Sequence, residues 1–122
     1  ELDTGAVADG QDNLTVNGLT NCEFWAMPAE DGLNRLIGEF VRNKTLPDVI
    51  IADPPRAGLT KSVGQKLVSL RPERIIYVAC NLNTINSSLQ PLLPFYTIKE
   101  VQPFDMFPQT EHLETVVVLD RK

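Results

Sequence analysis

The side chains best suited to chemistry in this sequence follow two short apolar runs. Cys80 comes directly after the run Ile75–Ala79, and the segment DPPRAGL, Asp53–Leu59, comes directly after the run Asp48–Ala52. A cysteine at the end of an apolar run either packs as a small hydrophobic side chain or, as a thiolate, acts as a nucleophile. Taken alone, the cysteine leaves both interpretations open.

Two prolines stiffen the turn that carries Asp53 and Arg56. Pro54 and Pro55 lack an amide hydrogen and fix φ, so they hold the carboxylate and the guanidinium on a rigid turn. In open α/β sheets, ligands bind beyond the carboxyl ends of the strands. If both apolar runs are strands, Asp53, Arg56 and the Cys80 thiol face one crevice.

Helix-period and strand-period segments alternate along the chain. Apolar residues recur three and four positions apart over Asp31–Asn43, which predicts an amphipathic helix there. Further helices are expected over Thr4–Asn17, after the N-cap residue Thr60, and from Ile85 to Leu92.

The apolar runs 48–52 and 75–79 show no polar alternation, which is typical of parallel strands covered by helices on both faces. Beyond them, the strand-like stretches Phe95–Phe104 and Leu113–Arg121 have no helix between them, which predicts an antiparallel hairpin. The expected fold is therefore α/β, with a mostly parallel sheet that ends in an antiparallel hairpin.

Composition limits the class of protein further. The chain has 122 residues, 43% of them hydrophobic, which fits one globular domain. Its net charge of −5 lacks the basic footprint of a nucleic-acid-binding domain. Long apolar segments and a leader are both missing, so a cytoplasmic protein without membrane contact is expected. Cys22 and Cys80 lie in no C-x-x-C or Cys/His cluster, which predicts free thiols and no metal site.

Three segments together resemble a known family. The segments "DPPRAGL", "YVACN" and "FDMFPQTEHLETVVVL" are similar to the three C-terminal signatures of the S-adenosylmethionine-dependent RNA uracil-5-methyltransferases. The opening segment "ELDTGAVADGQDNLTVNGLTNCEF" resembles the stretch that follows the glycine-rich cofactor loop in that family. The resemblance implies a Rossmann-like methyltransferase sheet, S-adenosylmethionine as cofactor, and tRNA or ribosomal RNA as substrate.

The resemblance also assigns roles to individual residues. Cys80 matches the nucleophile that adds to carbon 6 of uracil, and Glu114 matches the general base that removes the proton from carbon 5. Asp53 matches an acidic residue at the polar edge of the uracil and beside the cofactor. Arg56 is expected to contact RNA or orient the base. Glu1 aligns with the acidic residue that binds the ribose hydroxyls of the cofactor.

Several aromatic residues and one histidine have less certain roles. Phe104, Phe107 and Tyr77 are candidate stacking surfaces for a uridine turned out of the RNA fold. His112 is either an acid–base group or a residue that shapes the hairpin loop. Trp25 is expected near the adenine of the cofactor.

The chain contains no G-x-G-type loop. We therefore expect residues 1–122 to be the C-terminal portion of a methyltransferase catalytic domain, without the glycine-rich loop, its central strand and an RNA-binding N-terminal module. Such a piece is expected to be inactive alone, to bind the cofactor weakly, and to self-associate through an open strand edge or to rearrange. Alternatives are a non-catalytic interaction module, and an amino-group methyltransferase, which would use a D-P-P turn but no cysteine.

Overall fold

A computed structural model describes all 122 residues. Along the chain the elements are α1 (Thr4–Val16), α2 (Ala29–Asn43), β1 (Val49–Ala52), α3 (Lys61–Leu70), β2 (Arg74–Ala79), a 3₁₀ turn (Leu82–Thr84), α4 (Ile85–Leu89), β3 (Tyr96–Phe104) and β4 (Glu114–Arg121). No helix is both long and apolar enough to cross a lipid bilayer.

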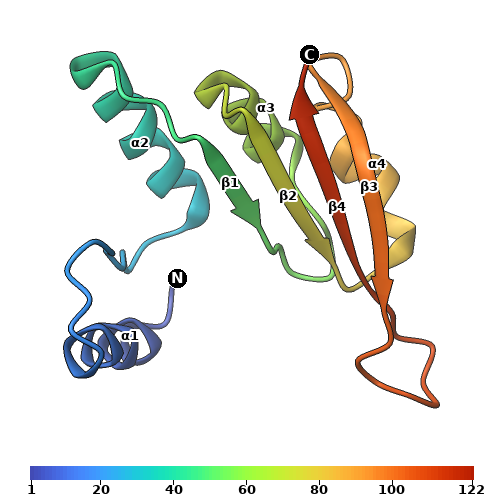
Figure 1. Ribbon diagram of the computed structural model, residues 1–122, viewed down its shortest axis with the longest axis horizontal. Coiled ribbons are helices and arrows are strands. Elements are labelled where there is room, and N and C mark those ends of the chain that lie inside the picture. The colour runs from blue at the N-terminus through green and yellow to red at the C-terminus, as the bar shows by residue number, and fades with distance from the viewer.

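The four strands form one sheet in the order β1-β2-β4-β3 (Figure 1). Strand β1 pairs with β2 in parallel, whereas β4 is antiparallel to both β2 and β3. The α/β class and the terminal antiparallel hairpin are thereby confirmed. Within these residues the sheet is mixed rather than mostly parallel, because β4 inserts between β2 and the outer strand β3.

Local signals in the sequence explain where the helices begin and end. The hydroxyl of Thr60 accepts a hydrogen bond from the Val63 amide at 3.2 Å, so this residue is the expected N-cap of α3. Helix α2 carries two acidic residues in its first turn, and its C-cap residue Lys44 adopts the left-handed conformation with φ 55°. Helix α4 ends at Leu89, earlier than expected, because the chain turns over residues 90–95 into β3.

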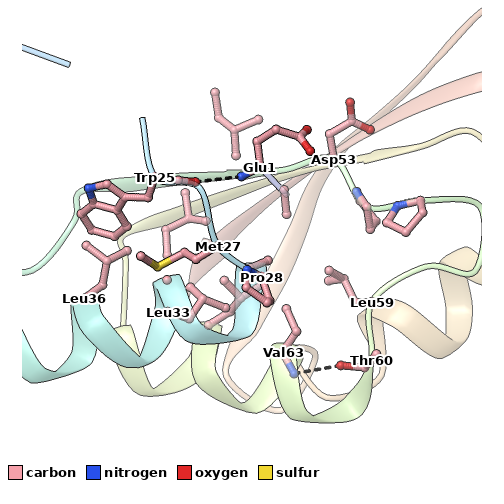
Figure 2. Close-up of a pocket in the computed structure, with 18 of the residues that line it drawn as sticks. Glu1, Trp25, Met27, Pro28, Leu33, Leu36, Asp53, Leu59, Thr60 and Val63 are labelled. Atoms are coloured by element: carbon pink, nitrogen blue, oxygen red, sulfur yellow. Dashed lines mark hydrogen bonds between the residues drawn. The ribbon is translucent and has the colours of Figure 1, made fainter. Parts of the chain in front are cut away.

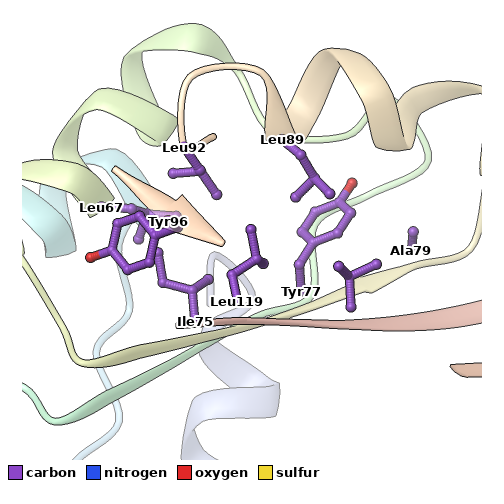
Figure 3. Packing of buried hydrophobic residues seen from close by; sticks show 9 residues of the cluster. Leu67, Ile75, Tyr77, Ala79, Leu89, Leu92, Tyr96 and Leu119 are labelled. Carbon is purple, nitrogen blue, oxygen red and sulfur yellow. The ribbon is translucent and has the colours of Figure 1, made fainter. Parts of the chain in front are cut away.

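The hydrophobic core lies between one face of the sheet and helices α3 and α4 (Figure 3). Alternate residues of β2 and β4 point into it, as their pairing requires. Tyr96 closes one end of the core, where its hydroxyl donates a hydrogen bond to the Pro72 carbonyl at 3.0 Å. Burial of this phenol raises its pKa. The members of the cluster are Leu67, Ile75, Tyr77, Ala79, Leu89, Leu92, Tyr96, Val117 and Leu119.

The opposite face of the sheet carries no helix, so the expectation that both apolar runs are covered on two faces is wrong for this chain. Ile51 of β1 is 70% exposed and Val49 is 48% exposed. Strand β1 also has no partner on its outer side. Helix α1 buries none of its residues and lies away from the sheet (Figure 1). An apolar sheet face and an open strand edge therefore meet at β1.

Candidate active site

Strand pairing brings Cys80 and Glu114 to the same end of the sheet. Ala79 of β2 is the partner of Thr115 of β4 in the antiparallel register, so the next residues outward are Cys80 and Glu114. Both line a cavity of about 250 Å³, together with Arg56, Phe107 and His112. Two residues 34 positions apart in sequence thus share one small cavity.

The Asp53–Leu59 turn is fastened to the loop that follows β2. The Gly58 amide donates to the Pro55 carbonyl at 2.8 Å, and Gly58 adopts a left-handed φ of +77°. The Leu59 amide donates to the buried hydroxyl of Ser88 at 3.0 Å. The Asn81 side-chain amide donates to the Arg56 carbonyl at 3.3 Å. These bonds hold the Arg56 backbone next to the segment that carries Cys80.

The Arg56 side chain reaches across to the hairpin loop. Its Nη2 lies 2.8 Å from Nδ1 and 3.1 Å from Nε2 of His112. The loop itself is held by Thr110, whose hydroxyl donates to the Phe107 carbonyl at 2.8 Å and accepts from the His112 amide at 3.2 Å. Arg56 forms no ion pair, because none of the three salt bridges of the chain includes it. Arg56 and His112 also line an adjoining cavity of about 390 Å³ with Cys80 and Glu111.

A larger cavity of about 610 Å³ lies on the other side of the same turn (Figure 2). Glu1 and Asp53 supply carboxylates at one side of it, and Leu33, Leu36 and Val63 are among its apolar walls. Its size is typical of a site for a small molecule. Carboxylates beside apolar walls suit a ligand that combines a flat ring, hydroxyl groups and positive charge, such as S-adenosylmethionine.

Glu1 is ionised more readily than an ordinary glutamate. Its carboxylate accepts hydrogen bonds from the amides of Asp3 at 3.0 Å and Leu2 at 2.6 Å. These bonds stabilise the charged form and lower the pKa of Glu1, the bond from Asp3 having the larger effect. A carboxylate has further lone pairs, so it can also accept from the hydroxyl groups of a ligand.

Trp25 lies at the wall of the larger cavity. Its indole nitrogen donates to the Glu23 carboxylate at 2.8 Å, and the Arg35 guanidinium stacks on its ring at 4.1 Å from the centroid. These two contacts fix the plane of the ring beside the cavity.

The predicted site residues thus divide between two cavities. Cys80, Glu114 and Arg56 line the small cavity, whereas Glu1 and Asp53 line the large one. The double proline separates Asp53 from Arg56, so the two ends of the turn face different cavities. Asp53 therefore lines the large cavity and not the small one, although the resemblance also assigned it a uracil contact.

Two aromatic predictions need comment. Tyr77 is fully buried in the hydrophobic core, so the prediction that it forms a stacking surface is wrong. The alternation of β2 turns Tyr77 toward the helices together with Ile75 and Ala79. Phe107 is 55% exposed and lines the Cys80 cavity, so it stays a candidate stacking surface.

The contact between Arg56 and His112 was not foreseen from the sequence. The two residues are 56 positions apart and belong to different loops, so no local spacing signals their contact. Only the strand order, which inserts β4 beside β2, brings the two loops together.

Comparison with known proteins identifies the family of the chain. The family model described as tRNA (Uracil-5-)-methyltransferase matches residues 1–122. An uncharacterized RNA methyltransferase of Bacteroides thetaiotaomicron is 43% identical over 94% of this chain, and one of Bacillus cereus is 38% identical over 96% of it. The chain spans 25% of the length of each of these relatives.

Solved structures give the same result for the fold. The tRNA (uracil-54, C5)-methyltransferase of Pyrococcus abyssi, in complex with S-adenosyl-L-homocysteine, matches 98% of this chain with a TM-score of 0.75 and 28% identity, over 27% of its own chain. A ribosomal RNA methylase of Streptococcus thermophilus matches 99% of this chain with a TM-score of 0.66 at 11% identity, which supports the fold alone.

The fold is that of a Rossmann-like methyltransferase. More narrowly, the chain belongs to the tRNA (uracil-5-)-methyltransferase family.

Proposed function

We propose that the full-length protein transfers a methyl group from S-adenosylmethionine to carbon 5 of a uridine in tRNA or ribosomal RNA. The observation that carries this proposal is the shared cavity of Cys80 and Glu114, a nucleophile and a base on adjacent strands. The family match and the structure with bound S-adenosyl-L-homocysteine support the same assignment.

Carbon 5 of uracil is a weak nucleophile, and covalent addition of Cys80 to the ring makes it a stronger one. Its thiolate adds to carbon 6, which forms an S–C bond and moves the electron pair of the 5,6 double bond into an enolate. The enolate carbon 5 is the atom that would accept a methyl group, and the sulfonium that gives it up would leave as a neutral thioether. S-adenosylmethionine, when bound, supplies an electrophilic methyl group on a sulfonium.

Glu114 completes the reaction. After methylation, carbon 5 carries both a methyl group and a proton, and the Glu114 carboxylate accepts that proton. The electron pair of the broken C–H bond restores the 5,6 double bond and expels the Cys80 thiolate from carbon 6. A carboxylate adjacent to the thiolate in the sheet register suits this elimination, because both groups act on neighbouring ring carbons.

The remaining residues bind and orient. Glu1 and Asp53 would hold the hydroxyl and ammonium groups of the cofactor, with Trp25 beside its adenine. Arg56 would bind the RNA at the rim of the small cavity, and Phe107 would stack on the base.

Covalent trapping tests this mechanism. The full-length protein should form an adduct with 5-fluorouridine RNA that survives denaturation, because fluorine at carbon 5 cannot leave as a proton does. Cys80→Ala should abolish the adduct, whereas Cys22→Ala, which removes the exposed second thiol, should leave it intact. Methylation activity that persists in Cys80→Ala would show that the mechanism is wrong.

A non-catalytic interaction module remains the second candidate. The observation in its favour is the uncovered face and edge of β1, where Ile51 is 70% exposed. In that case loss of the protein from cells would leave the 5-methyluridine content of tRNA and ribosomal RNA unchanged. The methyltransferase proposal requires that 5-methyluridine be lost from tRNA or ribosomal RNA in cells without the protein.

A further inference from the structure

The contact between Arg56 and His112 assigns the histidine a role of its own. Arg56 lies at the mouth of the small cavity, is exposed, and makes no ion pair. A long exposed arginine samples many rotamers, and fixing it costs entropy. Its single side-chain partner is His112, at 2.8 Å from Nη2 to Nδ1. We infer that His112 is a positioning residue that holds the Arg56 guanidinium at the cavity mouth, ready for the RNA.

The chemistry of the pair supports this role. A guanidinium can only donate hydrogen bonds, so in this contact the imidazole ring of His112 is the acceptor. An imidazole acceptor orients the arginine without forming an ion pair with it. A carboxylate in the same place would form an ion pair and compete with RNA phosphate for the guanidinium.

The geometry leaves Arg56 free to bind a second group. The contact with His112 uses Nη2, and the Arg56 side chain makes no other hydrogen bond. Its Nε and Nη1 donors remain for a phosphate or a base oxygen, which a guanidinium binds with two parallel bonds. His112 is itself held by the loop, because its amide donates to Thr110.

This inference rests on the proposed function for the identity of the RNA, but its test does not need methyl transfer. Affinity for unmodified tRNA and ribosomal RNA transcripts would be measured by fluorescence anisotropy in full-length protein carrying Cys80→Ala, so that no covalent adduct forms. Four proteins make a double-mutant cycle: the parent, Arg56→Ala, His112→Leu and the double variant. His112→Asn is added as the conservative variant, because its side-chain oxygen can accept a hydrogen bond where Nδ1 does.

His112→Leu should weaken RNA binding by about three- to tenfold, the range that follows from the net free energy of an ordinary hydrogen bond. In the Arg56→Ala background the same change should have almost no effect, because the group that His112 positions is gone. His112→Asn should recover most of the affinity. Arg42→Ala, which removes one positive charge from the last turn of α2, is the control for a general loss of charge.

Equal effects of His112→Leu with and without Arg56 would overturn the inference, since they would show a role independent of the arginine. Failure of His112→Asn to recover affinity, or no binding of either RNA by the parent protein, would also overturn it. A failure of the proposed function has a different result: coupled RNA binding is retained, but the protein with Cys80 intact forms no adduct and transfers no methyl group.

Discussion

Gly58 offers a sharp test of how the fold holds the Asp53–Leu59 turn. It adopts φ +77°, a region that L-residues avoid, and a methyl group there would collide with the Ser88 hydroxyl. Thr84 Cβ is a further neighbour, 3.1 Å from the added carbon. Gly58→Ala therefore strains the backbone and displaces a buried side chain.

The magnitude follows from these two effects. The left-handed backbone costs about 1–2 kcal/mol for a residue with a Cβ. Displacing Ser88 breaks its bond from the Leu59 amide, which adds about 1 kcal/mol or more. The variant should therefore lose about 2–4 kcal/mol of unfolding free energy, whereas Gly38→Ala should gain up to about 1 kcal/mol. Gly38 lies in α2 with open space around its Cβ position, so it is the matched control.

Urea unfolding of the 122-residue chain, followed by circular dichroism at 222 nm, measures both changes. With a urea dependence of about 1–2 kcal/mol per molar for a domain of this size, Gly58→Ala should lower the midpoint by more than about 1 M. Gly38→Ala should leave the midpoint unchanged or raise it. A Gly58→Ala midpoint within error of the wild type would refute the packing described for this turn.

Three further predictions concern the chain as a whole. The isolated chain should self-associate through the open edge of β1, as measured by sedimentation. Ile51→Lys, which charges the exposed face beside that edge, should shift the chain toward monomer. A monomeric wild type of unchanged fold would contradict the expectation. The isolated chain should bind S-adenosylmethionine only weakly, because it has no glycine-rich loop, so micromolar affinity by calorimetry would contradict this prediction. Glu30 accepts hydrogen bonds from Ser62 and, at 2.9 Å, from Lys66. The bond from Ser62 is the main reason that the pKa of Glu30 is lowered. A carboxylate with a lowered folded-state pKa stabilises the fold above pH 4.5, and this stabilisation is lost as the pH falls through the folded-state pKa. Glu30→Gln should therefore lower the urea midpoint at pH 7 but have a smaller effect near pH 3, and a constant difference across this range would contradict the assignment.

Much of the fold was predictable because its signals are local. Apolar spacing predicted α2 and α3, and a hydroxyl residue at the expected position, Thr60, caps α3. The absence of a helix after Leu93 predicted the hairpin of β3 and β4. Each of these features depends on residues close together in the sequence, so the pattern alone defines them.

The features that sequence reasoning missed depend on which strands become neighbours. The run Ile75–Ala79 is apolar throughout, so its residue types do not indicate that Tyr77 faces the core while Ile76 faces the uncovered side of the sheet. The separation of Asp53 from Arg56 into two cavities follows from the direction in which the double proline turns the chain. These outcomes are set by tertiary packing and not by local pattern.

Part of the candidate site was assigned from the sequence by resemblance to a family, and not from a local pattern. Cys80 and Glu114 were assigned by resemblance, and the sheet register then brings them together. That both take part in one reaction remains a prediction, as do the roles of Glu1, Asp53 and Arg56.

The most direct test of that reaction uses an ordinary uridine RNA and full-length Glu114→Gln. If Glu114 removes the proton from carbon 5, this variant should transfer the methyl group and then stall, so a methylated RNA bound covalently to Cys80 should accumulate and be seen by mass spectrometry of the denatured complex. The wild type should release its methylated product without accumulation. Release of methylated RNA by Glu114→Gln at the wild-type rate, with no trapped adduct, would contradict the pairing of Cys80 and Glu114 on one uracil ring.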